Sequence, residues 1–268
     1  MLKDITFGQY FESRSVLHRT DPRVKIVLMI LLIVFIFLSQ NMYALIFSAV
    51  SVLLILAVSK VPFKMYLKNM KAILPVLIFT AIINLFYGEG ETIFKVWKIV
   101  ITDGGVYRAT FMALRIALLI FISSVLTYTT TPNDLTDAIE SLLSPLKVIG
   151  LGSAVHTLAM MMTIALRFIP TLIEEAEKIM NAQKARGADL ESGSLISRIK
   201  ALIPILIPLL ISSVRRAYEL AEAMECRCYN GGEGKTRMKQ MKLSVTDLFV
   251  SILTLAICGG ILTLNILL

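Results

Sequence analysis

Long apolar stretches with almost no charge constrain this chain of 268 residues more than any other feature. We find five of them, at about 24–39, 43–59, 72–87, 107–128 and 245–267. A helix of about 20 apolar residues crosses the hydrocarbon core of a bilayer. Apolar residues make up 56% of the chain, against about 45–50% in a soluble domain. The sequence therefore predicts an all-α integral membrane protein with about five transmembrane helices.

The polar residues divide the chain into an N-terminal membrane part with four spans, a polar part and a C-terminal span, at 1–128, 129–243 and 244–268. The polar part opens with Thr131-Pro132-Asn133-Asp134, a pattern typical of a helix start. Two long helices are expected next, over 153 to about 190 and 194 to about 229. Each begins apolar and becomes amphipathic. We interpret the polar part as a cytoplasmic coupling domain of amphipathic helices.

The distribution of Lys and Arg predicts the orientation in the membrane. With the amino terminus inside, 23 of the 27 basic residues fall on inner segments. Inner segments of membrane proteins carry an excess of Lys and Arg. We therefore predict a cytoplasmic amino terminus, a cytoplasmic 129–243 and an outer carboxyl terminus. The same bias explains the net charge of +8 without a nucleic-acid partner.

Two features of the membrane part stand apart from the spans. Residues 88–107 alternate and are rich in β-branched and aromatic residues between glycines, which indicates a short strand or hairpin. Arg115 lies inside the fourth stretch, where a charge is energetically unfavourable. We favour a structural role for Arg115. The alternatives are a functional role, or that Arg115 and Arg108 together contact the outer headgroups.

The two long amphipathic helices end alike. The first delivers Ala185-Arg186-Gly187 to its end, and the second delivers Cys226-Arg227-Cys228. Small neighbours leave a guanidinium sterically free, and its planar set of donors suits an acidic groove on another protein. The alternative is that each arginine complements the helix dipole and reaches lipid headgroups. Two ends of the same kind favour protein contact.

At these residues the sequence resembles a known family. The motifs are Leu17-His18-Arg19-Thr20-Asp21-Pro22-Arg23-Val24-Lys25, Arg167-Phe168-Ile169-Pro170 continuing to Ala185-Arg186-Gly187, and Ala221-Glu222-Ala223-Met224-Glu225-Cys226-Arg227-Cys228. They resemble the transmembrane T component of energy-coupling factor transporters, the ABC-type importers of vitamins and metal ions. The resemblance covers essentially the whole chain.

The resemblance implies that Arg186 and Arg227 dock into grooves on two ABC ATPase subunits. The second signature departs from the Ala-Arg-Gly pattern, because Cys226 and Cys228 replace the usual Ala and Gly. Both are small, so docking should survive. The helix is nevertheless expected to lose its glycine cap there, and Gly231-Gly232 to supply the stop instead.

The resemblance further implies a non-catalytic subunit in a prokaryotic plasma membrane. ATP and Mg would be used by the partner subunits, and a substrate-binding membrane S component would be a third partner beside the surrounding lipid. Candidate contacts with it are Met160, Met161, Met162, Leu206 and Leu210, with packing in an ordinary bundle core as the alternative. Gly234-Lys235-Thr236 lacks the spacing of a phosphate-binding loop. Neither histidine predicts a metal site.

Two other classes of membrane protein remain open. A membrane-embedded enzyme acting on lipid or prenyl substrates would need paired acidic motifs, and Asp134 and Asp137 are the one close pair. A stand-alone permease would predict inverted repeats and polar residues inside the spans. Either would work as a single purified chain, whereas a T component would be inert alone.

Overall fold

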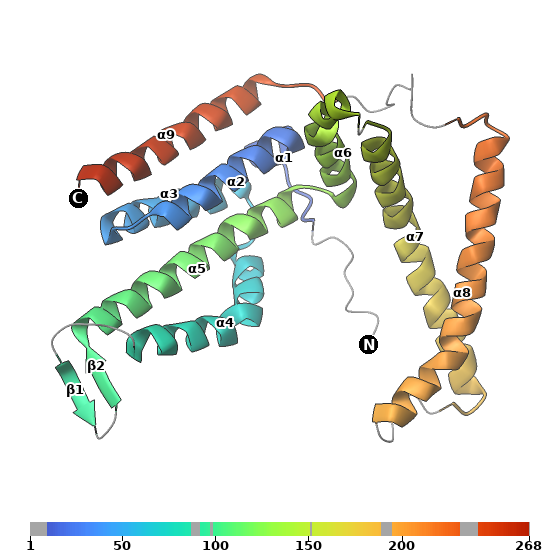
Figure 1. Cartoon of the computed structure of the whole chain (residues 1–268), viewed down its shortest axis with the longest axis horizontal. Coiled ribbons are helices and arrows are strands. Elements are labelled where there is room, and N and C mark those ends of the chain that lie inside the picture. The colour runs from blue at the N-terminus through green and yellow to red at the C-terminus, as the bar shows by residue number, and fades with distance from the viewer. Residues whose placement is uncertain are drawn as a thin grey trace. The chain divides into compact units, whose positions relative to one another are not determined.

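The computed structural model describes residues 10–86, 92–96, 99–150, 152–188, 195–230 and 241–267. The chain forms two compact units, which we describe separately. The bundle unit comprises Gly8–Ala138 and Lys239–Leu268. The helix-pair unit is built on Ile139–Met238. Figure 1 shows helices throughout both units, so the predicted all-α class is confirmed.

The bundle unit consists of α1 (Val16–Arg19), α2 (Pro22–Leu38), α3 (Met42–Ser59), α4 (Phe63–Phe86), α5 (Asp103–Thr129), α9 (Val245–Leu267) and the strands β1 (Thr92–Val96) and β2 (Ile99–Thr102). Helix α5 packs against α2, α3 and α4, and α9 packs against α2 and α3 (Figure 1). Large side chains fill the interior between them, among them Ile36, Leu45, Tyr66 and Ile122. Because α9 packs on helices from the start of the chain, the bundle depends on contacts between its two ends.

The helix boundaries in the bundle unit follow from local sequence. Asp21 caps α2 by accepting a hydrogen bond from the backbone N–H of Arg23, with Pro22 at the first helical position as predicted. Thr102 caps α5 in the same way through the N–H of Gly105. A Cβ atom on Gly105 would lie 2.4 Å from the carbonyl oxygen of Leu85. Glycine therefore allows the start of α5 to approach the end of α4.

Five helices are long and apolar enough to cross a membrane, namely α3, α4, α5, α7 (Gly152–Ala185) and α9. The predicted number agrees, but the membership differs. The predicted span at 24–39 corresponds to α2, whose 17 residues are not among the five. At 1.5 Å per residue α2 measures roughly 26 Å, a little less than the hydrocarbon core. Helix α7, which we assigned to the polar part, replaces it in this set.

The third predicted span begins too late. Helix α4 starts at Phe63, ahead of the predicted start at 72, and Lys64, Lys68 and Lys71 are exposed along its first turns. Pro75 lies inside α4, which bends in Figure 1. The hairpin expected within 88–107 is confirmed, because β1 and β2 pair antiparallel. Residues 87–91 and Trp97 lie outside the described residues.

The helix-pair unit contains the end of α6 (Pro132–Leu143), a 3₁₀ helix η2 (Ser144–Ile149), α7 and α8 (Leu195–Glu225). Both predicted long helices exist, although each ends about four residues earlier than expected. They contain Pro170, Pro204 and Pro208 without interruption. Figure 1 shows α7 and α8 crossing with opposite chain directions.

Candidate functional site

The end of α7 is closed by backbone hydrogen bonds that fix the position of Arg186. The N–H of Gly187 donates to the carbonyl oxygen of Lys184 at 3.0 Å, and the N–H of Ala188 donates to that of Gln183 at 3.0 Å. This pair of bonds defines a Schellman motif, with Arg186 at the C-cap. Gly187 follows with a φ of 87°, a value that favours glycine.

The end of α8 has the same geometry around Arg227. The N–H of Cys228 donates to the carbonyl oxygen of Glu225 at 2.8 Å, and the N–H of Tyr229 donates to that of Met224 at 3.0 Å. Arg227 therefore occupies the same C-cap position as Arg186. This end has no glycine cap, as expected, but the prediction of a later stop at Gly231-Gly232 was wrong, because α8 ends at Glu225 and Cys228 itself adopts the left-handed conformation with a φ of 55°. Gly231-Gly232, the predicted replacement, lies outside the described residues.

Both signatures lie at the surface. All six of their residues are exposed: Ala185, Arg186, Gly187, Cys226, Arg227 and Cys228. Within the described part of the chain, neither guanidinium takes part in an ion pair. Each arginine is thus presented at a helix end, with its donors available to another molecule.

The two helices are joined by a charged contact in the second half of each. An Arg216 guanidinium nitrogen lies 2.6 Å from Glu175 Oε2, and Ser212 Oγ donates to Glu175 Oε1. Glu175 precedes Arg186 by eleven residues, and Arg216 precedes Arg227 by eleven. Each arginine is therefore roughly 16 Å along its helix from the contact. Because the helices run in opposite directions, the two arginines lie at opposite ends of the pair (Figure 1).

Sequence reasoning missed one arginine near the end of α8. A cavity of about 430 Å³ between α7 and α8 is lined by Arg227 and also by Arg167. Arg167 belongs to the motif Arg167-Phe168-Ile169-Pro170, which carried part of the family resemblance without an assigned role. Its position in a recognisable motif was the available signal, but only the folded pair shows that it lies beside Arg227.

The predicted apolar contact residues do not form one uniform surface. Met161 is 61% exposed, whereas Met160 and Met162 are half-buried. On α8, exposed apolar residues include a set that recurs at helical spacing: Ile196, Ile199, Ile203, Leu206, Leu210 and Val214. Leu206 and Leu210 therefore belong to a continuous apolar stripe, which an amphipathic helix normally covers with another element.

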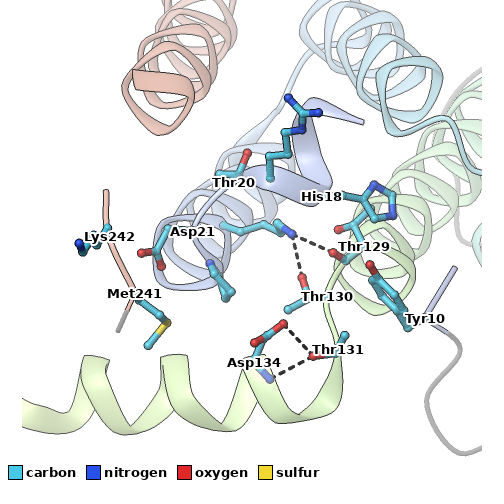
Figure 2. Close-up of a pocket in the computed structure, with 13 residues that line it drawn as sticks. Tyr10, His18, Thr20, Asp21, Thr129, Thr130, Thr131, Asp134, Met241 and Lys242 are labelled. Carbon is cyan, nitrogen blue, oxygen red and sulfur yellow. Dashed lines mark hydrogen bonds between the residues drawn. The ribbon is translucent and has the colours of Figure 1, made fainter. Parts of the chain in front are cut away.

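A second polar site lies in the bundle unit, around the first turn of α2 (Figure 2). Lys25 is 5% exposed, and its Nζ donates to the carbonyl oxygen of Thr129 at 3.0 Å and to Thr130 Oγ1 at 2.9 Å. Thr129 is the last residue of α5, and Thr130 is its C-cap. Lys25 thus attaches the start of α2 to the connection that leads into α6.

The other side of the same turn is attached to the start of α9. Asp247 Oδ1 accepts from the backbone N–H of Asp21 at 2.8 Å, and its Oδ2 accepts from that of Ser244 at 2.7 Å. Arg23 pairs with Asp21 at 3.1 Å and donates to the carbonyl oxygen of Met241 at 2.9 Å. We call Asp21, Arg23, Lys25 and Asp247 the joint residues. Through these contacts the first turn of α2 binds two segments. One precedes Ala138, where the chain leaves the bundle unit, and the other follows Lys239, where it returns.

His18 lies in the same pocket (Figure 2). Its Nε2 is 2.8 Å from the carbonyl oxygen of Phe11, and its Nδ1 is 2.6 Å from Ser15 Oγ. Burial lowers the pKa of His18 below its usual 6.5, although the hydrogen bond to Phe11 acts in the opposite direction. The neutral imidazole can donate from Nε2 and accept at Nδ1, which satisfies both neighbours.

The acidic pair considered for an enzyme has a structural explanation at one member. Thr131 Oγ1 donates to Asp134 Oδ2 at 2.8 Å and accepts from the backbone N–H of Asp134 at 3.2 Å (Figure 2). This is the helix-capping arrangement that the sequence predicts. The contacts thus tie Asp134 to the start of α6.

Arg115 also has a structural environment. Its guanidinium donates to the carbonyl oxygen of Ser39, the C-cap residue of α2. The same group lies 4.5 Å from the centroid of the Phe111 ring and 5.7 Å from that of Phe37. A cation at a helix C-terminus and over aromatic rings is favourable. These contacts support the structural role that we favoured for Arg115.

Known proteins resemble the chain over nearly its whole length. The family described as the cobalt transport protein CbiQ matches residues 13–238. The energy-coupling factor transporter transmembrane protein EcfT of Clostridium kluyveri is 52% identical over 267 residues, 98% of each chain. Proteins of the same name from Ruminiclostridium cellulolyticum and Bacillus subtilis are 50% and 40% identical, over 95% and 96% of this chain and 94% and 97% of theirs. The chain therefore belongs to the EcfT/CbiQ family, the transmembrane components of energy-coupling factor transporters.

Proposed function

We propose that this chain couples ATP hydrolysis by two partner ABC ATPase subunits to the uptake of a vitamin or metal ion by a membrane S component. The observation that carries the proposal is the pair of identically built helix ends. Each presents an exposed arginine at the C-cap of a Schellman motif, eleven residues from the Glu175–Arg216 contact. Two equivalent docking ends suit two partner subunits.

The contact between α7 and α8 supports transmission of movement. Glu175 on α7 binds both Ser212 and Arg216 on α8. A displacement of one helix would therefore be transmitted to the other. The two oxygens of the Glu175 carboxylate bind two different side chains of α8, which fixes the orientation of the contact as well as its distance. Arg186 and Arg227 would therefore follow a rotation of the ATPase subunits instead of sliding over them. The coupling domain would be 129–243, as the sequence predicts.

The apolar stripe on α8 is the proposed contact with the S component. Its exposed residues include Leu206 (57%) and Leu210 (65%), and Met161 on α7 offers a flexible apolar side chain. We place the amino terminus and the coupling domain on the cytoplasmic side of a prokaryotic plasma membrane, because the ATPase subunits need cytoplasmic ATP and Mg. The carboxyl terminus would face outward, and membrane lipid would surround the bundle unit.

The proposal is tested by co-purification from membranes. We would tag the chain and compare wild type with Arg186→Glu, Arg227→Glu and the double variant. Arg215→Glu is the matched control, since Arg215 is an exposed arginine of α8 outside the signature. We expect two ATPase subunits with wild type and the control, and neither with the double variant. Wild type that purifies alone and transports in reconstituted vesicles would support a stand-alone permease, and lipid turnover would support an enzyme.

A further inference from the structure

The cavity at the end of α8 has the composition of a binding groove. It measures about 430 Å³ and is lined by both helices of the pair. The lining residues are Ile164, Arg167, Phe168, Arg216, Glu219, Leu220, Ala223, Met224 and Arg227. On each helix they recur three or four residues apart, so each helix contributes one face.

The charges of the groove are unbalanced. Arg216 is already paired with Glu175 at 2.6 Å. Arg167 and Arg227 are exposed, and neither forms an ion pair with any residue that the structure describes. One carboxylate, Glu219, faces the same groove. Two guanidinium groups are therefore available for a ligand with carboxylates.

The apolar part of the groove indicates what kind of ligand fits. Four apolar residues that line the groove are half-buried: Ile164, Phe168, Leu220 and Met224. An apolar lining beside two arginines suits a partner that presents an apolar side chain beside a carboxylate. Glu219 repels any anionic group, but it can accept a hydrogen bond from a backbone N–H, which a protein segment offers and a phosphate group does not. The composition therefore favours a protein segment over a lipid headgroup.

The two docking ends differ in this respect. Arg227 shares its groove with a second arginine, Arg167, which comes from the other helix. Counted eleven residues from the Glu175–Arg216 contact in opposite chain directions, the α8 position that corresponds to Arg186 is residue 205. The stretch 201–211 around this position contains no charged residue. The sequence of α8 therefore offers no second arginine at the position that corresponds to Arg186.

We propose that Arg167 is a second docking arginine, which acts with Arg227 to bind an acidic, partly apolar segment of one of the two ATPase subunits. This inference rests on the proposed function and extends it, because it makes the two docking ends unequal. The groove then selects which ATPase subunit binds at the end of α8. The other subunit binds at Arg186 without help from Arg167.

The test is the recovery of each ATPase subunit separately, with the full-length tagged chain in membranes that contain both. The variants are Arg167→Glu, Arg167→Lys, Arg186→Glu and Arg227→Glu, with Arg215→Glu as the control. We expect Arg167→Glu to lower recovery of one subunit by about tenfold or more. It should be the same subunit that Arg227→Glu removes, and recovery of the other should not change. The retained subunit shows that the variant is folded, and Arg167→Lys should keep much of the binding.

Three results would overturn the inference. If the Arg167→Glu variant recovers both ATPase subunits as well as wild type does, Arg167 does not dock, and the proposed function is unaffected. Loss of both subunits from a variant that is monodisperse in size-exclusion chromatography would show that the groove is not specific for one. If the recovery of both ATPase subunits is unchanged but fewer anionic phospholipids co-purify per chain, as measured by mass spectrometry, the groove binds a lipid. If wild type itself recovers no ATPase subunit, the proposed function fails.

Discussion

Asp247 offers the sharpest test of the joint residues, because one buried carboxylate holds two separate segments. It is 3% exposed, and it accepts from the backbone N–H groups of Asp21 and Ser244 at 2.8 and 2.7 Å. In Asp247→Ala both donors lose their acceptor. Asp21 is buried, and a buried donor left without a partner costs about 1–3 kcal/mol. Ser244 is exposed, so water can replace its acceptor and only the net hydrogen bond of about 1 kcal/mol is lost. We therefore expect a loss of about 2–4 kcal/mol in the free energy of unfolding.

The measurement is the temperature at which the detergent-solubilised chain loses its monodisperse peak in size-exclusion chromatography. For a chain of this size, 1 kcal/mol corresponds to about 2–4 °C. A central loss of about 3 kcal/mol therefore corresponds to roughly 9 °C. Asp247→Asn keeps one carbonyl acceptor, so its loss should be about half as large.

Asp103→Ala is the matched control. Asp103 is the acidic residue in the first turn of α5, as Asp247 is in α9, but it is exposed. Its removal should change stability by less than about 1 kcal/mol, the usual contribution of a carboxylate to the helix dipole. If Asp247→Ala shifts the transition no more than Asp103→Ala does, the two hydrogen bonds do not hold the segments together, and our account of the joint is refuted.

Three further outcomes follow from the described contacts. Cys228→Gly should stabilise the end of α8 by about 1 kcal/mol, since it removes a side chain from a left-handed φ, and amide hydrogen exchange at Tyr229 should slow. Lys25→Met should destabilise the chain by about 1–3 kcal/mol in thermal unfolding, because Thr129 and Thr130 lose a buried donor, and Lys68→Met on exposed α4 should not. The folded-state pKa of His18 lies below its unfolded value of 6.5, so wild type should lose stability as the pH falls through and below 6.5, and His18→Gln should lose less.

Much of the fold could be predicted because membrane helices are encoded locally. Apolar stretches gave the positions of α3, α5 and α9, and Asp21 and Thr131 marked the starts of two helices. The error at α4 came from relying on charge. Its first turns carry exposed lysines at helical spacing, and the change from polar to apolar residues resembled a boundary although the backbone continues.

The joint could not be predicted, because its partners are far apart in the chain. Lys25 and Thr129 are 104 residues apart, and Asp21 and Asp247 are 226 apart. In the sequence alone Lys25 is one of several basic residues beside a span, which the orientation rule explains completely. Nothing local distinguishes it from a lysine that reaches the headgroups. Only the packing of α2 against α5 and α9 shows that it is buried and bound.

The error at Cys228 shows which part of the docking signature the fold uses. A glycine commonly ends a helix, so its absence at position 228 predicted a later stop at Gly231-Gly232. The structure ends both helices by the same two backbone hydrogen bonds, which require a left-handed residue after the arginine but no particular side chain. Cysteine can adopt that left-handed conformation at an energetic cost of about 1–2 kcal/mol. The residue after the arginine therefore sets how firmly the helix end is held, whereas the length of the helix sets where the arginine points.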